Sequence, residues 1–172
     1  MINIVVASQD QHALQIRELF WEYLQWANPR VNEEFNVNFD IAAMLEDDMQ
    51  HLNKFMPPKG QLLLGYSENQ LAGIACLKEL TLEIGEIKRM YVRSEHRGKG
   101  LARGLISRLL EEAKQIGYKL IRLDSAEFMK EAHQLYRTTG FKEIEAYEGS
   151  EIPKAFQSHW IFMEMKLSEN QN

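Results

Sequence analysis

The sequence has little cysteine and no long apolar segment. Its one cysteine, Cys76, excludes an internal disulfide, and its position in the apolar run 71–77 indicates a small buried side chain in preference to a nucleophile. No apolar run is long enough to span a bilayer, and the N-terminus lacks a basic region followed by an apolar core. We therefore predict neither a membrane span nor a signal peptide, and we expect a cytoplasmic location.

Positive charge is also scarce. The chain has 20 Lys and Arg against 25 Asp and Glu, a formal net charge of −5. Non-specific binding of nucleic acid needs a basic surplus to neutralise phosphates, so that class of function is excluded, although a local basic patch stays open. The five histidines show no metal-ligand spacing. We expect no metal, and we expect His96 and His133 at the surface.

The sequence does contain enough apolar residues for a core. Its 172 residues, 45% of them apolar and 26% charged, fit one domain spanning 1–172. No repeat, low-complexity segment or interdomain linker is visible. The polar tail 168–172 is expected to be frayed.

Hydrophobic periodicity predicts the order of the elements. Helical spacing follows the capping pair Ser8 and Gln11 and again follows Asp40, and Pro29 is expected to end the first helix. Further helices are predicted over 101–116 and 128–139. Alternating or continuous apolar runs predict strands over 2–6, 61–66, 70–78, 83–92, 119–124, 141–146 and 159–167. The order β-α-α-β-β-β-α-β-α-β-β predicts an α/β fold, with a mixed sheet covered by helices on both faces.

A glycine-containing basic loop stands where the strand 83–92 leads into the helix 101–116. The N-terminus of a helix presents unpaired N–H groups and the positive end of the helix dipole, which together bind anions. Gly98 and Gly100 have no Cβ, so a ligand can approach the backbone closely, while Arg97 and Lys99 add positive charge. The loop therefore predicts a site for phosphate or pyrophosphate.

Two familiar phosphate motifs fit this loop poorly. The dinucleotide fingerprint needs a third glycine, where this sequence has Arg103, and it belongs near the first strand of a βαβ unit. The P-loop needs Gly-Lys followed by Ser or Thr, and Gly98-Lys99 is followed by Gly100. On local chemistry alone, a glycine-rich turn with an incidental basic pair also stays open.

Two segments carry a resemblance to a known family. Residues 97–102 match the acyl-CoA loop pattern Gln/Arg-x-x-Gly-x-Gly/Ala of the GNAT N-acetyltransferase superfamily. Residues 132–141 resemble that family's Ala-x-x-Leu-Tyr-x-x-x-Gly-Phe segment, and the predicted element order agrees as well. The resemblance implies a mostly antiparallel mixed sheet and acetyl-CoA as the acyl donor. Many members of the family dimerise, so a homodimer is left open.

The resemblance also implies which residues hold acetyl-CoA. Backbone amides of the loop would bind the CoA pyrophosphate, and backbone groups of the preceding strand would pair with the pantetheine arm as an added strand does. The positions concerned are Met90, Tyr91, Val92, Arg97, Gly98, Lys99, Gly100, Leu101 and Ala102. One departure from the family pattern is Met129, because many members carry an asparagine there that can hydrogen-bond the pantetheine.

Two residues are the candidate proton carriers. Tyr136 occupies the family's tyrosine position and would protonate the departing thiolate, although a plain buried aromatic is the alternative. Glu86 lies where several members place a glutamate that acts directly or through water, and Glu83 is an alternative base. Strand alternation is expected to put Glu86, Lys88, Met90 and Val92 on one face.

Taken together, the resemblance implies an N-acetyltransferase that moves an acetyl group from acetyl-CoA to a primary amine in a ternary complex. No nucleophile with a base partner is visible, so no covalent acyl-enzyme is expected. A small-molecule amine is the expected acceptor; a protein N-terminus or lysine, and a non-catalytic acyl-CoA sensor, stay open. The acidic run 46–48 is either a wall that favours a cationic amine or a solvated helix face.

Overall fold

The fold is built on one mixed sheet. The computed structural model describes residues 1–169, in which seven strands pair in the order β1-β2-β3-β4-β5-β7-β6. Every neighbouring pair is antiparallel except β4 and β5, which confirms the predicted mixed, mostly antiparallel sheet. The strands are Ile2–Val6, Gln61–Ser67, Gln70–Thr81, Ile84–Val92, Leu120–Ala126, Lys142–Ile144 and Trp160–Lys166. The predicted frayed tail lies mostly outside the described residues.

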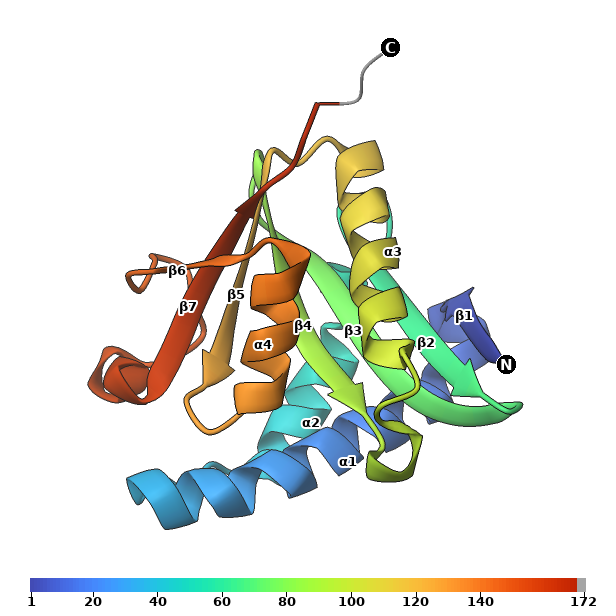
Figure 1. The fold of residues 1–172 in the computed structure, drawn as a ribbon. Coiled ribbons are helices and arrows are strands. Elements are labelled where there is room, and N and C mark those ends of the chain that lie inside the picture. The colour runs from blue at the N-terminus through green and yellow to red at the C-terminus, as the bar shows by residue number, and fades with distance from the viewer. Residues whose placement is uncertain (170–172) are drawn as a thin grey trace.

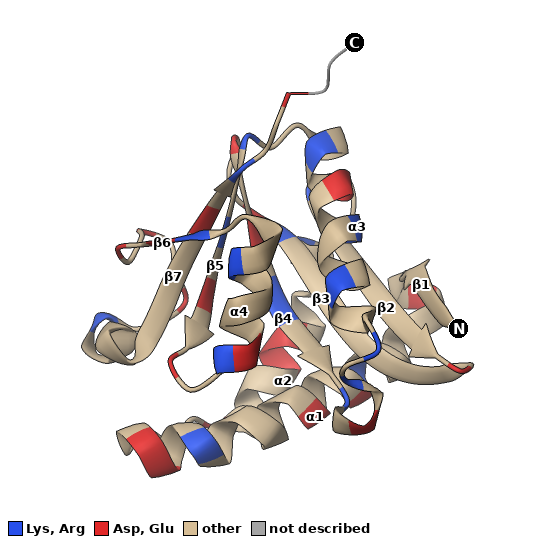
Figure 2. Cartoon of the chain, viewed as in Figure 1, with Lys and Arg blue, Asp and Glu red and all other residues tan. Residues whose placement is uncertain are grey.

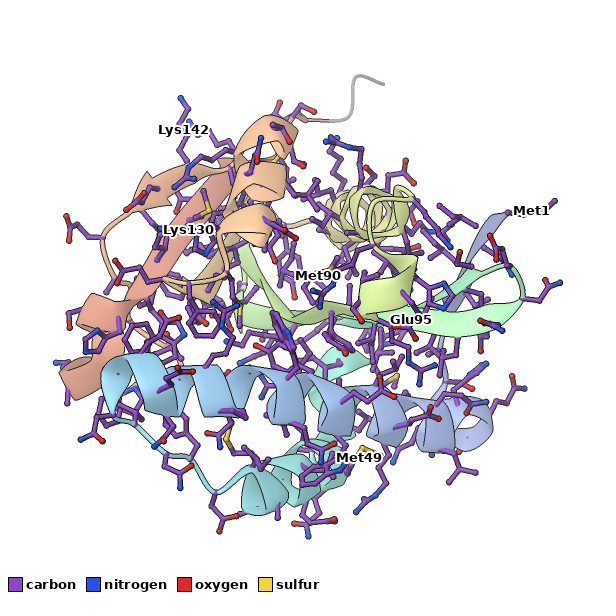
Figure 3. The ribbon with its side chains drawn as sticks, turned by 60° about the horizontal axis from the view of Figure 1, so that its bottom comes forward. Met1, Met49, Met90, Glu95, Lys130 and Lys142 are labelled. Carbon is purple, nitrogen blue, oxygen red and sulfur yellow. The ribbon has the colours of Figure 1, made fainter. Side chains whose placement is uncertain are left out.

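Helices cover both faces of the sheet, as predicted. Helices α3 and α4 lie on one face and α1 and α2 on the other (Figure 1), and Figure 3 shows these three layers from the bottom of that view. The helices α1 to α4 are Gln9–Phe35, Ile41–Gln50, Leu101–Ile116 and Lys130–Thr139, and short 3-10 turns occupy Leu52–Phe55, Ser94–His96 and Lys154–His159. No helix among the described residues is long and apolar enough to cross a membrane.

Each face of the sheet has its own apolar core. Residues of α3 spaced three and four apart, among them Leu101, Leu105 and Leu109, are fully buried against the strands, as their helical spacing predicts. On the other face, Ile16, Phe20 and their α1 neighbours pack with α2, β2 and β3. The sheet is therefore packed from both sides by apolar side chains of the helices.

Local sequence signals set most helix ends. The side chain of Ser8 accepts a hydrogen bond from the Gln11 backbone N–H, and that of Asp40 accepts one from the Ala43 backbone, so both N-cap residues are confirmed. The capping box predicted for Ser8 and Gln11 is only half confirmed, because the Ser8 backbone N–H donates to His12 Nδ1 at 3.1 Å and not to the Gln11 side chain. Gly117 ends α3 with a φ of 107°, a left-handed conformation that favours glycine.

The prediction that Pro29 ends the first helix is wrong. Helix α1 continues through Pro29 to Phe35, although an interior proline removes one backbone hydrogen bond and costs about 3 kcal/mol. Packing beyond the proline offsets this cost, because Val31 is buried and the ring of Phe35 stacks on Phe128 with centroids 6.1 Å apart. The extra turns matter for function, since they border the cavities described below.

The strands β4 and β5 separate halfway along their length. They pair from Ile84 opposite Leu120 to Ile87 opposite Leu123, and beyond that point β4 pairs only with β3 while β5 pairs only with β7. Backbone groups on the freed edge of β4 therefore face an opening in the sheet. This opening lies near the centre of the molecule, between α1 and α4.

A β-bulge at Arg89 changes the faces of β4. The register with β3 shifts between Ile74 and Cys76, and Arg89 takes a φ of 53°, which is uncommon for a residue other than glycine. Met90 consequently packs on the same side of the sheet as Ile87, although strict alternation would place them on opposite sides. The predicted shared face of Glu86, Lys88, Met90 and Val92 is therefore wrong, because the bulge interrupts the alternation.

Candidate active site

A large cavity, called the larger cavity below, opens where β4 and β5 separate. It has a volume of about 1030 Å³ and is bordered by α1, the end of β4, the loop before α3, and α4. All of the predicted acetyl-CoA contacts line it except Lys99, whose ammonium lies 3.7 Å from the carboxylate of Glu68 at the surface. The segments 90–92 and 97–102, which the sequence assigned to one site, thus line one cavity in the structure.

The N-terminus of α3 forms one wall of this larger cavity. Gly98 and Gly100 have φ values of 74° and 86°, and no side chain within the described residues 1–169 caps the first turn of the helix. A Cβ added at Gly98 would contact nothing within 4 Å, so the space above this backbone is open to a ligand. Arg30, Arg97 and Arg103 also line the cavity, and together these features suit an anionic ligand.

Two side chains beside the loop are held in place. Arg97 donates from Nε to the Val92 carbonyl at 2.9 Å, and its guanidinium lies 5.0 Å from the ring centre of Trp26. His96 is only 5% exposed, lines the larger cavity, and has a buried Nδ1 with no partner among the described residues. The prediction of a surface position for His96 is wrong, because the short 3-10 turn that contains it folds its ring inward.

The smaller cavity lies against the other side of the same opening. Its volume is about 350 Å³, and its walls come from α1, α2, β4, β5 and the segment 151–153. The two cavities share Trp26, Met90, Met129, Ala132 and Tyr136. Figure 3 shows Met90 at the centre of the molecule, between α1 and the layer of α3 and α4. A ligand in each cavity would therefore meet near Met90 and Tyr136.

Tyr136 stands at this meeting point. It is 5% exposed, and its ring packs edge-on against Phe141 with centroids 5.8 Å apart. None of the side-chain hydrogen bonds among residues 1–169 involves its hydroxyl group. Desolvation, with smaller contributions from Tyr23 and Asp124, raises the pKa of Tyr136 well above its ordinary value. The phenol therefore keeps its proton at neutral and moderately alkaline pH.

Glu86 is buried but lies apart from both cavities. It is 1% exposed, accepts a hydrogen bond of 2.6 Å from the Tyr147 hydroxyl, and lines neither cavity. Desolvation raises the pKa of Glu86, while Lys88 and the Tyr147 hydrogen bond partly oppose the rise. Its role as base stays a prediction, and a proton from the smaller cavity would reach it only through an intermediary. Glu83 is exposed and pairs with Lys119.

The smaller cavity contains a network of charges that the sequence did not predict. Lys88 and Arg89 are adjacent in the chain and both are buried. Figure 2 shows basic residues in the middle of β4. Lys88 bonds Asp124 at 3.0 Å, while Arg89 bonds Asp48 of α2 through Nε at 2.7 Å and Nη2 at 3.0 Å. Of the acidic run 46–48, only Asp48 enters the interior, where Arg89 neutralises it. The sequence signal that could have indicated this network is the pair Lys88-Arg89 inside a buried strand.

A serine and a histidine also meet beside the smaller cavity. Nε2 of His133 lies 3.0 Å from Oγ of Ser125, which lines the cavity. His133 is 2% exposed, so the predicted solvated position is wrong. Desolvation, aided by Arg137, lowers the pKa of His133 and keeps the imidazole neutral near pH 7. Strand β5 and helix α4 bring the pair together from eight residues apart, and the Ser125 hydroxyl also lies in donor geometry to Met129 Sδ at 3.6 Å. The expectation that no nucleophile has a base partner therefore stays a prediction.

The comparison with protein families shows which family the chain belongs to. The profile of the Acetyltransferase (GNAT) family matches residues 13–141. The chain belongs to the GNAT acetyltransferase family. As a GNAT protein it is an acetyl-CoA-dependent N-acetyltransferase, and the matched residues include the loop before α3 and the Tyr136 segment.

Individual relatives of this GNAT protein agree. An uncharacterised N-acetyltransferase of Schizosaccharomyces pombe is 26% identical over 171 residues, covering 98% of this chain and 96% of the relative. N-acetylaspartate synthetase of Xenopus tropicalis is 30% identical over 116 residues, 66% of this chain and 43% of that protein. A GNAT family acetyltransferase of Elizabethkingia anophelis, solved with acetyl-CoA bound, has the same fold with a TM-score of 0.65, at 19% identity over 96% of this chain and 98% of that one.

Proposed function

We propose that this GNAT enzyme binds acetyl-CoA in the larger cavity and a small-molecule primary amine in the smaller one, and transfers the acetyl group directly between them. The observation that carries the proposal is that the two cavities share Met90 and Tyr136. Binding both substrates in contact converts a bimolecular reaction into one within a single complex.

The larger cavity suits the parts of acetyl-CoA. The uncapped N-terminus of α3 and the three arginines suit the pyrophosphate, with close approach at Gly98 and Gly100. The unpaired edge of β4 at residues 90–92 suits the amide groups of the pantetheine arm, because an extended chain can add to a free strand edge. Met129, close to Ser125 Oγ at 3.6 Å, offers this arm no strong hydrogen bond.

The reaction transfers one acetyl group from sulfur to nitrogen, and it moves two protons, one away from the nitrogen and one onto the sulfur. The neutral amine attacks the thioester carbonyl, a C–N bond forms, and the C–S bond breaks. The nitrogen loses a proton to a base, and Tyr136 gives its proton to the departing sulfur. A raised pKa keeps Tyr136 in the protonated form that this step requires. A backbone N–H on the freed edge of β4 would stabilise the carbonyl oxygen as negative charge develops on it.

The base is proposed to be Glu86, acting through water. Its raised pKa makes it a stronger proton acceptor than an exposed glutamate, which supports the assignment. Its position behind Tyr147, outside the cavity walls, requires the intermediary.

The size of the smaller cavity favours a small acceptor over a protein. Its volume of about 350 Å³ falls at the lower end of the range for small-molecule sites. The similarity to N-acetylaspartate synthetase, whose name gives an acetylated amino acid as product, supports the same class.

The proposal is tested by amine-dependent release of CoA. The enzyme is mixed with acetyl-CoA and a panel of small primary amines, and the free thiol is followed with a colorimetric thiol reagent. We expect at least one small amine to raise thiol release far above the rate without amine, and mass spectrometry to find the acetylated amine. Tight acetyl-CoA binding without amine-dependent release would instead indicate a non-catalytic sensor. Release with peptides alone would indicate a protein acceptor.

A further inference from the structure

The charges in the wall of the smaller cavity and behind it are not all held equally. Asp48 and Asp124, the partners supplied by α2 and β5, are almost fully buried, with side chains 2% and 6% exposed. Glu151 is different, because it comes from the irregular segment between β6 and the last 3-10 turn, and its side chain is 42% exposed. Two partners are therefore fixed parts of the interior, and the third reaches in from the surface.

Glu151 bridges both cations with a single carboxylate. Its Oε1 lies 3.0 Å from Nζ of Lys88 and 2.8 Å from Nη1 of Arg89, and its Oε2 lies 3.4 Å from Nη2 of Arg89. Desolvation opposes the charge, but Lys88 and Arg89 hold the pKa of Glu151 well below its ordinary value. The place occupied by this group is thus a built site for a carboxylate.

A count of charges shows what Glu151 contributes. Lys88 and Arg89, with Lys54 bonded to Asp48 at 3.1 Å, give three positive charges, against two negative charges on Asp48 and Asp124. One positive charge is left, and Glu151 neutralises it. Any other carboxylate in the same position would do so equally well, and buried charge is stable only when it is paired.

The position of this carboxylate relative to the transfer point defines a ligand. Lys88, Arg89 and Glu151 line the smaller cavity together with Met90 and Tyr136, near which the acetyl group would arrive. The remaining walls are mainly apolar, with Leu24, Val31, Phe39, Ile41, Met44, Ile152 and Trp160. A bound acceptor would meet cations at one end, apolar side chains around its body, and the thioester at its amine.

We propose that the acceptor is an amino acid with an apolar side chain, and that its carboxylate replaces that of Glu151 between Lys88 and Arg89. Glu151 then turns outward to solvent, for which its exposed position leaves room. The unusual left-handed backbone at Arg89 has a use in this arrangement, because the bulge lets two consecutive side chains reach the cavity. The inference rests on the proposed function and adds the class of acceptor to it.

Matched acceptor pairs test the inference. Leucine is compared with isoamylamine, and phenylalanine with phenylethylamine; each pair differs only by the carboxylate. A charge-assisted hydrogen-bond pair contributes about 1.5–3 kcal/mol, and displacing the partly exposed Glu151 carboxylate costs about 0.4–1 kcal/mol. We therefore expect kcat/KM to be about 2- to 80-fold higher for each amino acid than for its decarboxylated partner. Equal values within a pair, or a polyamine such as spermidine as the best acceptor, would overturn the inference while leaving acetyl transfer intact. Thiol release with no amine at all would instead contradict the proposed function.

The variant Glu151→Gln gives an independent test with a definite sign. Removing the competing carboxylate is expected to lower KM for the amino acids by about two- to fivefold, the range of one partly exposed ion pair. KM for the decarboxylated amines should not fall, because the variant leaves one positive charge in the cavity without a partner. Glu148→Gln, an exposed position on the same segment, is the matched control and should change neither value. Thermal unfolding checks that each variant is folded. A higher KM for amino acids, or an equal loss of kcat/KM with both kinds of acceptor, would mean that Glu151 binds the amine or holds its own loop in place. Either result would overturn the proposed replacement of Glu151 by the acceptor carboxylate.

Discussion

The glycine loop allows a prediction that separates ligand binding from backbone strain. Gly98 and Gly117 both have positive φ, 74° and 107°, and a Cβ added at either would contact nothing within 4 Å. Alanine in this conformation costs about 1–2 kcal/mol at either position. For a chain of this length that corresponds to a fall in Tm of about 2–8 °C. The two alanine variants should therefore be destabilised alike.

Their affinity for acetyl-CoA should differ. Gly98 lines the larger cavity and Gly117, at the opposite end of α3, lines neither cavity. If the added methyl group at Gly98 prevents one phosphate oxygen from bonding a backbone N–H, about 1.5–3 kcal/mol is lost, a weakening of about 10- to 150-fold. Calorimetric titration of Gly98→Ala and Gly117→Ala with acetyl-CoA measures this directly. Equal affinities in the two variants would refute the assignment of the loop as the pyrophosphate site.

Three further substitutions test other parts of the account. Tyr136→Phe should lower kcat about 100-fold and leave the acetyl-CoA Kd unchanged, and a variant as fast as wild type would exclude the acid role. Because the pKa of Tyr136 is raised, the wild-type rate should not fall between neutral pH and about pH 9. Glu86→Gln should lower the rate most at low pH, where free amine is scarce, and a uniform loss below about threefold would exclude the base. Asp48→Asn removes a charged partner of the buried Arg89 and should lower the free energy of unfolding, measured by chemical denaturation, by about 3–5 kcal/mol. The exposed Glu46→Gln should lower it by less than about 1 kcal/mol.

Local signals in the sequence were sufficient for most of the fold. Caps at Ser8 and Asp40, a left-handed glycine at position 117, and regular helical spacing in α3 each act through neighbours in the chain, so the sequence predicts them well. The two predicted segments around the larger cavity also came from contiguous motifs. Pro29 shows the limit of local rules, because the helix continues past the proline through packing of Phe35 against Phe128, which lies 99 positions after Pro29 in the chain.

The smaller cavity could not be predicted in the same way. The bulge at Arg89 follows from pairing with β3, and without it Lys88 and Arg89 would point to opposite faces. Asp48, Asp124 and Glu151 reach these cations from three distant segments, and no spacing in the sequence records such a meeting. The inward positions of His96 and His133 likewise depend on tertiary packing. Motifs therefore predict the residues around the larger cavity better than those around the smaller one.

Mixing the enzyme with acetyl-CoA in the absence of any amine distinguishes direct transfer within a ternary complex from transfer through a covalent intermediate. For direct transfer, we expect no stoichiometric burst of CoA, an unchanged intact mass of the protein, and thiol release that begins only when amine is added. A burst of one CoA per enzyme, with an acetyl group found on Ser125 beside His133, would contradict it and indicate a covalent intermediate.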